Sequence, residues 1–361
     1  MCRYSSIYII MKKFIGVLLF AASFALASCK DGPKKDLLEG PAVEVLGKNM
    51  YSSLILHYRS ISDFYGGRAL VEDTNGKCGL IDTQGNVLIE CIYDRVLDLV
   101  DSYGICYVSL NGAWGIYNSD FKKVTKCLYD SLRLPNEGIV TLSINKNSIY
   151  GAIDVSDGSI VIPFEYEYLG AYSEDLFAAE KKIKGRSLYG YIDKSNSTVI
   201  PFIYADADDF SEGVAAVQKE SKTIYTQYGP IPTRALGFIN NKGETVIPFK
   251  FQSQMSSIEF HEGLCGIGIT KDPNLFGETK KNSFIDKNGE IVISGMFDDA
   301  EDFENGVALI KKAGKYGYMN HNGEVIIPCV YDDCGYEKDK LCLKKDGVEY
   351  FFSYDGELIK E

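Results

Sequence analysis

The chain has 361 residues and a formal net charge of −12, with 45% hydrophobic and 24% charged residues. These fractions are ordinary for a globular protein. The acidity, without any cluster of basic residues, excludes nucleic acid as an expected partner, because the surface would repel phosphate. The many Tyr (25), Phe (19) and Gly (35) residues favour strands joined by tight turns.

The amino terminus has the organisation of an export signal. Lys12 and Lys13 precede an uncharged, mostly apolar run at residues 14–27. This run is shorter than the about 20 residues of a membrane-spanning helix and has the length of a secretory hydrophobic region. It ends at Leu26-Ala27-Ser28-Cys29, which resembles the lipobox of bacterial lipoproteins. The resemblance implies cleavage before Cys29 and a lipid on its thiol.

Three segments follow from this reading. We expect residues 1–28 to be a signal peptide whose true start is Met11, and residues 29–42 to be a lipidated, flexible tether. The remaining residues, 43–361, form the repeat domain. The expected location is the bacterial cell envelope, at the outer membrane, with the membrane contacted through the lipid on Cys29. The charged Lys30-Asp31 pair resembles the surface-export signals of some lipoproteins.

One pattern recurs from residue 55 onward, with its clearest copy from Phe303 to Asp332. A period of this size marks a repeat architecture. Each copy centres on a glycine followed by an aromatic or apolar residue, at intervals of 34 to 47 residues. These positions are Gly79, Gly115, Gly151, Gly190, Gly237, Ser283 and Gly317. An eighth, eroded copy runs from Tyr331 to Ile359 and lacks the last strand.

Each copy predicts four short strands. A segment such as Phe297–Phe303 comes first, and a Glu-Gly or Asn-Gly turn follows, where glycine accepts a positive φ. An alternating strand and the glycine-centred strand come next. A second turn then leads to Val-Ile-Pro, and we expect its proline to close the fourth strand, because proline cannot donate to a sheet ladder.

The repeat resembles the WG repeat family, named for a Trp-Gly pair. The resemblance covers residues 55–359. Only Ala113-Trp114-Gly115 keeps the tryptophan, while the F-x-E-G, G-x-I-D and V-I-P elements recur. The family implies an extracytoplasmic interaction module with no activity attached.

Four strands in each unit predict an all-β array of about eight repeats, like the blades of a β-propeller. An open β-solenoid is the alternative. Residues near Val43–Leu46 are a candidate for the strand missing from the eighth copy, which would fasten a closed ring.

The cysteines predict buried free thiols. All eight cysteines after Cys29 occupy positions where the repeat elsewhere has a hydrophobic residue or alanine, as buried thiols do. No C-x-x-C pair supports zinc, and we expect neither a metal nor another cofactor.

No catalytic motif is present, so we expect a protein that is not an enzyme. The histidines His57, His261 and His321 are interpreted as solvated residues, the last two in turns. Recurring aspartates such as Asp82 and Asp286 indicate scaffold; a glycosidase pair or a calcium turn is the weaker alternative.

Two copies are longer than the others, and both insertions fall between the second and third strands. The first contains Tyr225, Tyr228 and Arg234, and the second contains Phe276. Inserted hairpins in a repeat array emerge on one face and commonly carry recognition. We therefore expect these residues to bind a partner, against the simpler possibility of neutral loop drift.

The expected function is a lipid-anchored binding or scaffold module for a protein, peptide or glycan. A carbohydrate-active enzyme on a propeller scaffold and a structural component of an envelope complex are the alternatives.

Overall fold

The computed structural model describes residues 47–146, 148–226, 229–251, 258–268, 283–294, 297–337 and 339–359. The expected signal peptide, the tether and Cys29 lie outside these residues, as do Tyr228 and Phe276. Among the described residues no helix is long and apolar enough to cross a membrane. The chain divides into two compact units: an amino-terminal unit whose described part is residues 47–172 and 194–196, and a carboxyl-terminal unit of residues 173–193 and 197–359.

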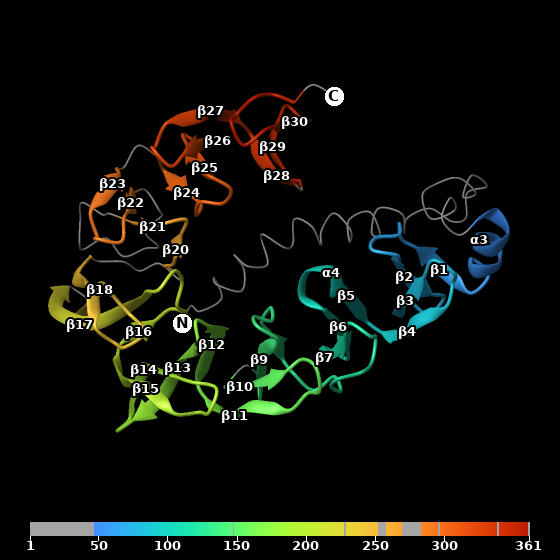
Figure 1. Cartoon of the computed structure of the whole chain (residues 1–361), viewed down its shortest axis with the longest axis horizontal. Helices are drawn as coiled ribbons and strands as arrows, with labels where there is room; N and C mark the ends of the chain where they lie inside the picture. The colour runs from blue at the N-terminus through green and yellow to red at the C-terminus, as the bar shows by residue number, and fades with distance from the viewer. Residues whose placement is uncertain are drawn as a thin grey trace. The chain divides into compact units, whose positions relative to one another are not determined.

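The described chain is all-β, with eight antiparallel sheets that follow one another along the sequence (Figure 1). In every sheet each strand pairs with its sequence neighbour, which is the meander order of a propeller blade. Six sheets have four strands and two have three. The expected β-repeat array is therefore confirmed, and closure of the array into a ring stays a prediction.

The first four sheets are called sheets 1 to 4. Sheet 1 contains β1 (Tyr58–Ile61), β2 (Arg68–Asp73), β3 (Cys78–Asp82) and β4 (Val87–Tyr93). Sheet 2 contains β5 (Arg95–Leu99), β6 (Ile105–Leu110) and β7 (Ala113–Asn118). Sheet 3 contains β8 (Ser131–Leu132), β9 (Ile139–Ile144), β10 (Ile149–Asp154) and β11 (Ile160–Tyr166). Sheet 4 contains β12 (Tyr168–Ser173), β13 (Leu176–Ile183), β14 (Arg186–Ile192) and β15 (Thr198–Tyr204). Two short helices, α3 (Lys48–Leu54) and α4 (Val100–Tyr103), accompany them.

The last four sheets are called sheets 5 to 8. Sheet 5 contains β16 (Asp206–Ala207), β17 (Ala215–Thr226), β18 (Gly229–Ile239) and β19 (Thr245–Phe251). Sheet 6 contains β20 (Phe260–His261), β21 (Leu264–Ile267), β22 (Ser283–Ile285) and β23 (Ile291–Ile293). Sheet 7 contains β24 (Asp299–Ala300), β25 (Val307–Lys312), β26 (Lys315–Asn320) and β27 (Val325–Tyr331). Sheet 8 contains β28 (Asp333–Glu337), β29 (Lys340–Lys345) and β30 (Val348–Phe352).

Sheets 2 and 8 lack a regular fourth strand. In sheet 8 a single bridge joins Phe352 to Leu358, so the expected loss of the last strand is confirmed. Sheet 2 was not expected to differ. Its fourth segment is reduced to isolated bridges, among them Trp114 to Tyr129. Its sequence has Lys126 where four of the other copies have proline.

The hydrophobic core lies between consecutive sheets. In the amino-terminal unit, Leu80 and Ile89 of sheet 1 pack with Cys106 and Val108 of sheet 2. In the carboxyl-terminal unit the same arrangement joins sheets 5 and 6, 6 and 7, and 7 and 8. Each repeat therefore buries its apolar faces against its neighbours, as repeat arrays do. The contacts between two consecutive sheets are called a seam below and are numbered by those sheets.

The recurring glycine and the proline lie at the same point of the sheet, where the third strand meets the fourth. A Cβ on Gly317 would lie 2.4 Å from the carbonyl oxygen of Ile327 and 2.9 Å from the amide nitrogen of Cys329. The pairing of β26 with β27 shifts register at this point, which marks a bulge. The backbone of the fourth strand thus lies directly against Gly317, where a Cβ would not fit.

The expectation that proline closes the fourth strand is wrong. Pro163, Pro201, Pro248 and Pro328 lie inside β11, β15, β19 and β27, all of which continue for three residues beyond. These strands are at the sheet edge and bulge at the proline, where a missing N–H costs no ladder hydrogen bond.

Candidate functional site

The first insertion forms a long two-stranded ribbon. β17 and β18 have 12 and 11 residues, whereas the corresponding strands β25 and β26 have six each. β16 pairs with β17 only at Gln218 and Val217, and β19 pairs with β18 only from Leu236 to Ile239. Beyond those points the two strands pair with each other as far as Thr226 and Gly229. The insertion therefore extends an existing hairpin and is not an open loop.

The two edges of this ribbon differ. Pro230 faces Tyr225 and Pro232 faces Thr223. Pairs in an antiparallel ladder alternate between bonded and non-bonded, and prolines two residues apart share one kind. Because proline has no N–H, both fit the non-bonded pairs, with their nitrogens turned outward. The β18 edge is thus closed to further strands, while Thr223 and Tyr225 turn their N–H and C=O groups outward on the β17 edge.

Arg234 stands at the base of the ribbon. Its side chain is 48% exposed, and one guanidinium nitrogen lies 3.6 Å from a carboxylate oxygen of Asp206 on β16. An exposed pair at this distance contributes little to stability. The guanidinium is therefore only weakly paired and is open to solvent.

The structure places only part of the expected site. Arg234 and the backbone of Tyr225 belong to the ribbon. The side chain of Tyr225 lies outside the described residues, as do Tyr228 and Phe276. Whether the two insertions come together stays a prediction.

The F-x-E-G element joins consecutive repeats through its second residue. Ser173 Oγ donates to the carbonyl oxygen of Phe210, and Ser211 Oγ donates to that of Phe260, both at 2.6 Å. In the amino-terminal unit Asn136 Nδ2 donates to the carbonyl oxygen of Tyr172 at 2.8 Å. The acceptor is always the aromatic residue of the same element in the following repeat. This contact could not be predicted from a single repeat, because its partners are 36 to 49 residues apart.

The glutamate of the element forms a second link. The N–H of Gly213 donates to Glu174, that of Gly263 to Glu212 and that of Gly306 to Glu262, at 2.9 to 3.0 Å for the shorter bond of each pair. Glu212 has a φ of 54° and Glu262 a φ of 52°, a conformation that disfavours side chains other than Asn, Asp and Gly. The link to the next repeat explains why a glutamate occupies such a strained position.

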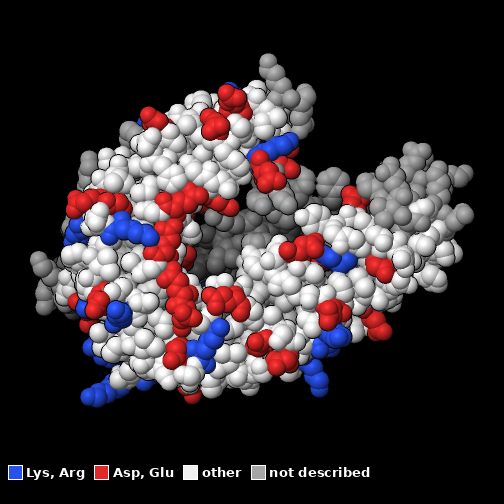
Figure 2. All heavy atoms as spheres, in the orientation of Figure 1, with Lys and Arg blue, Asp and Glu red and all other residues white. Residues whose placement is uncertain are grey.

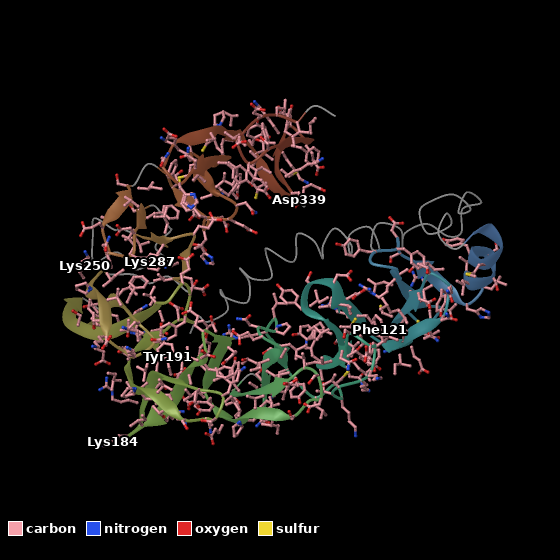
Figure 3. All side chains as sticks on the ribbon, in the orientation of Figure 1. Phe121, Lys184, Tyr191, Lys250, Lys287 and Asp339 are labelled. Carbon is pink, nitrogen blue, oxygen red and sulfur yellow. The ribbon has the colours of Figure 1, made fainter. Side chains whose placement is uncertain are left out.

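A cation from the second turn of the following repeat completes the seam. Lys287, labelled in Figure 3, places Nζ 3.2 Å from a carboxylate oxygen of Glu212. Burial works to raise the pKa of Glu212, but the N–H of Gly263 and the ammonium of Lys287 outweigh it and lower the pKa below its usual range. Glu212 is therefore an ionised structural carboxylate.

The recurring aspartates hold turns. Asp286 Oδ1 accepts the backbone N–H groups of Asn288 and Glu290 at 3.0 and 2.9 Å. Asp82 makes the same two bonds with Gln84 and Asn86, and Asn240 and Asn320 take this role in other repeats. Asparagine serves equally well because the turn needs an acceptor oxygen and not a charge. Among the described residues no group of three or more His, Cys, Asp or Glu could hold a metal ion.

One carboxyl departs from this pattern. Burial and the nearby Asp206, Glu259 and Asp209 raise the pKa of Asp208 well above its usual range, although its carboxylate accepts the N–H of Ile258. The carboxyl group lies where sheets 5 and 6 meet. Figure 2 shows acidic side chains gathered in a band over the part of the carboxyl-terminal unit that carries β16 and β20.

The eight cysteines after Cys29 are free thiols, of which Cys106, Cys265 and Cys342 are fully buried. Burial raises the pKa of Cys91 and of Cys334 to about 11 in each case. A thiol that stays protonated is a poor nucleophile and metal ligand. Their assignment to the hydrophobic positions of the repeat agrees with this burial.

The two turn histidines are not simply solvated. His261 and His321 are 38% and 36% exposed, and each lies beside carboxylates at seam 6/7. The sequence could not indicate the contacts of His261 with Asp302 and of His321 with Glu262, since these join different repeats. His57 is exposed, as expected.

Solved structures offer remote likenesses. A computationally designed protein, Ika8, has a TM-score of 0.43 at 12% identity, covering 82% of this chain and 96% of its own. BamB from Moraxella catarrhalis gives 0.41 at 9%, with the same coverages. The β-propeller domain of the Trilobed protease from Pyrococcus furiosus gives 0.41 at 11%, covering 75% and 96%. No curated protein matches the sequence.

A family model described as WG containing repeat matches seven segments. They are residues 79–112, 114–147, 150–182, 189–222, 237–267, 283–316 and 316–348. Each begins at or beside the recurring glycine or its serine replacement, and together they span well over half of the chain. The chain therefore belongs to the family of proteins built from WG-containing repeats.

Proposed function

We propose that this protein is a lipid-anchored binding or scaffold module of the bacterial envelope, displayed at the outer membrane or cell surface, for a protein, peptide or glycan partner. The observation that carries the proposal is the ribbon of β17 and β18, whose strands have 12 and 11 residues where β25 and β26 have six each. Elsewhere the recurring polar residues hold turns and seams, so they are already engaged in the fold.

The ribbon favours a peptide or protein over a glycan. The main-chain groups of Thr223 and Tyr225 face outward on the β17 edge, and such an edge accepts an extended segment by strand addition. Arg234 and the tyrosines of the insertion are residue types that anchor interfaces. The acidic band in Figure 2 further favours a partner with basic residues.

The recurring carboxylates argue against a glycosidase built from them. Asp82 and Asp286 accept two backbone N–H groups each, and the pKa of each is lowered, that of Asp82 chiefly by Asn86 and that of Asp286 chiefly by the N–H of Glu290. A general acid needs a raised pKa.

The test compares the full chain with a variant whose ribbon is reduced to the ordinary hairpin. Lys219 pairs with Ala235 as Lys312 pairs with Lys315. Residues 220–234 can therefore be replaced by Ala-Gly, the pair that joins β25 to β26. Capture of envelope proteins, peptides and glycans is measured for both forms, with Arg234→Ala as a milder variant. We expect the shortened form to fold and to lose its partner; a folded variant that captures the same partner with unchanged affinity contradicts the proposal.

The anchor has a separate test. Labelled palmitate should enter the wild-type protein in cells, while Cys29→Ser should remain unlabelled and leave the membrane fraction. Equal labelling of the two forms contradicts lipidation at Cys29 without affecting the binding proposal.

A further inference from the structure

Seam 6/7 differs chemically from its neighbours. At seam 5/6 the side chains beside the glutamate link are Ser211 and Lys287. Serine does not titrate near neutral pH, and the lysine ammonium stays charged throughout that range. At seam 6/7 both of these positions hold histidine, the side chain whose charge changes between about pH 5 and 8.

His261 occupies the position of Ser211 in sheet 6. Its Nε2 lies 3.6 Å from a carboxylate oxygen of Glu259 on its own segment and 3.9 Å from one of Asp302 in the following repeat. A further acid, Asp208, interacts electrostatically with Glu259. Burial, followed by the nearby Asp206, Glu259 and Asp209, raises the pKa of Asp208 well above its usual range.

His321 occupies the position of Lys287, in the repeat that follows. Its Nε2 lies 3.1 Å from a carboxylate oxygen of Glu262 in sheet 6. Its ring stacks on Phe303, with centroids 4.4 Å apart and planes 17° from parallel. The same Glu262 carboxylate accepts the N–H of Gly306. The imidazole of His321 and the amide of Gly306 therefore contact one carboxylate.

The two histidines contact acids in opposite directions across the seam. His261 belongs to sheet 6 and reaches Asp302 of the next repeat, while His321 belongs to the next repeat and reaches Glu262 of sheet 6. We propose that seam 6/7 is a pH-responsive joint, which tightens when the imidazoles of His261 and His321 take up protons.

The sign follows from the charges. Histidine side chains in general change charge between about pH 5 and 8, a range in which carboxylates ordinarily stay ionised. Protonated rings then attract carboxylates of the neighbouring repeat. As the pH rises above this window the rings become neutral and the attraction is lost. The pairs are partly exposed, so their effect is modest. We expect the population of molecules in which the Gly306–Glu262 bond at seam 6/7 is broken to change roughly two- to fivefold.

The test uses seam 5/6 as an internal reference. Hydrogen exchange of the Gly306 amide reports seam 6/7, and that of the Gly263 amide reports the matched bond at seam 5/6. Protection factors of the full chain are measured from pH 7.5 to 5.5. We expect the protection of Gly306, relative to Gly263, to rise roughly two- to fivefold on acidification.

The matched variant installs the residues of the reference seam, His261→Ser with His321→Lys. Its ratio of protection should stay constant over the same pH range. If the double variant fails to fold, His321→Lys alone should halve the pH response or more, since it replaces the closest pair. A wild-type ratio that does not change with pH overturns the proposal, as does a variant that keeps the full response.

Discussion

The glycine of the third strand gives the sharpest test of how the repeat is built. In Gly317→Ala the new Cβ would meet the carbonyl oxygen of Ile327 at 2.4 Å and the backbone of Pro328 and Cys329 at 2.8 and 2.9 Å. Carbon and oxygen need more than 3.0 Å, and every contact is with backbone of β27, so the edge strand must move. Overpacking of this kind costs about 3 kcal/mol at the upper end of its usual range.

The net loss is smaller than this cost. Alanine restricts the unfolded chain and returns about 0.5–1 kcal/mol, which leaves a destabilisation of about 2 kcal/mol. For a large domain this lowers the melting temperature by about 4–8 °C. Thermal unfolding followed by circular dichroism measures the shift. In Gly115→Ala the nearest atoms lie at 3.1 Å, so that matched variant should lose less than half as much.

A Gly317→Ala protein as stable as the wild type, or a Gly115→Ala protein destabilised as much as Gly317→Ala, would refute the steric explanation.

Two further predictions concern the thiols and the seams. Thiol titration in denaturant without reductant should find the cysteines after the tether free, and three or more disulfides would contradict this. Cys106→Asp should destabilise the protein strongly, because the new carboxylate would be buried beside Asp98, whose Oδ1 lies 3.5 Å from the sulfur of Cys106. The lowered pKa of Glu212 means that its contribution to seam 5/6 is present above the ordinary glutamate pKa and lost as the pH falls through the folded value. Protection of the Gly263 amide should therefore decline below about pH 4.5, and Glu212→Gln should remove this decline while leaving a weaker bond in place.

The sequence predicted the sheets because each copy repeats its own local chemistry. Turn residues with positive φ, such as Gly213, and the apolar residues of β25, of which Val307, Ala308 and Ile310 are buried, can be recognised within one copy. The prolines led to a wrong prediction, because the effect of a proline depends on whether its strand is central or at the edge of the sheet. Pro328 would break a central ladder, but the fourth strand is an edge, and that is a property of the sheet and not of the four residues around the proline.

The seams could not be predicted for the opposite reason. Ser211 contacts Phe260, and Glu262 contacts His321. In each pair the two residues are separated in the sequence by more than the length of one repeat. Within a single copy, a serine and a glutamate stand beside a glycine, and a tight turn is enough to explain these three residues. The positive φ of Glu262 is visible only in the structure. Because this φ is strained for a glutamate, the turn alone does not explain why a glutamate occupies the position.

The residues that maintain the repeat fold leave few others for binding a partner. Residues that recur in every copy hold turns, bulges or seams, because the same geometric problem recurs in every copy. Binding to one partner poses a problem that arises once, so its residues must be ones that do not recur. The described chain departs from its pattern most clearly in the ribbon of β17 and β18 and in the paired histidines of seam 6/7. The first departure changes the surface that a partner meets, and the second changes how firmly the following repeat is held.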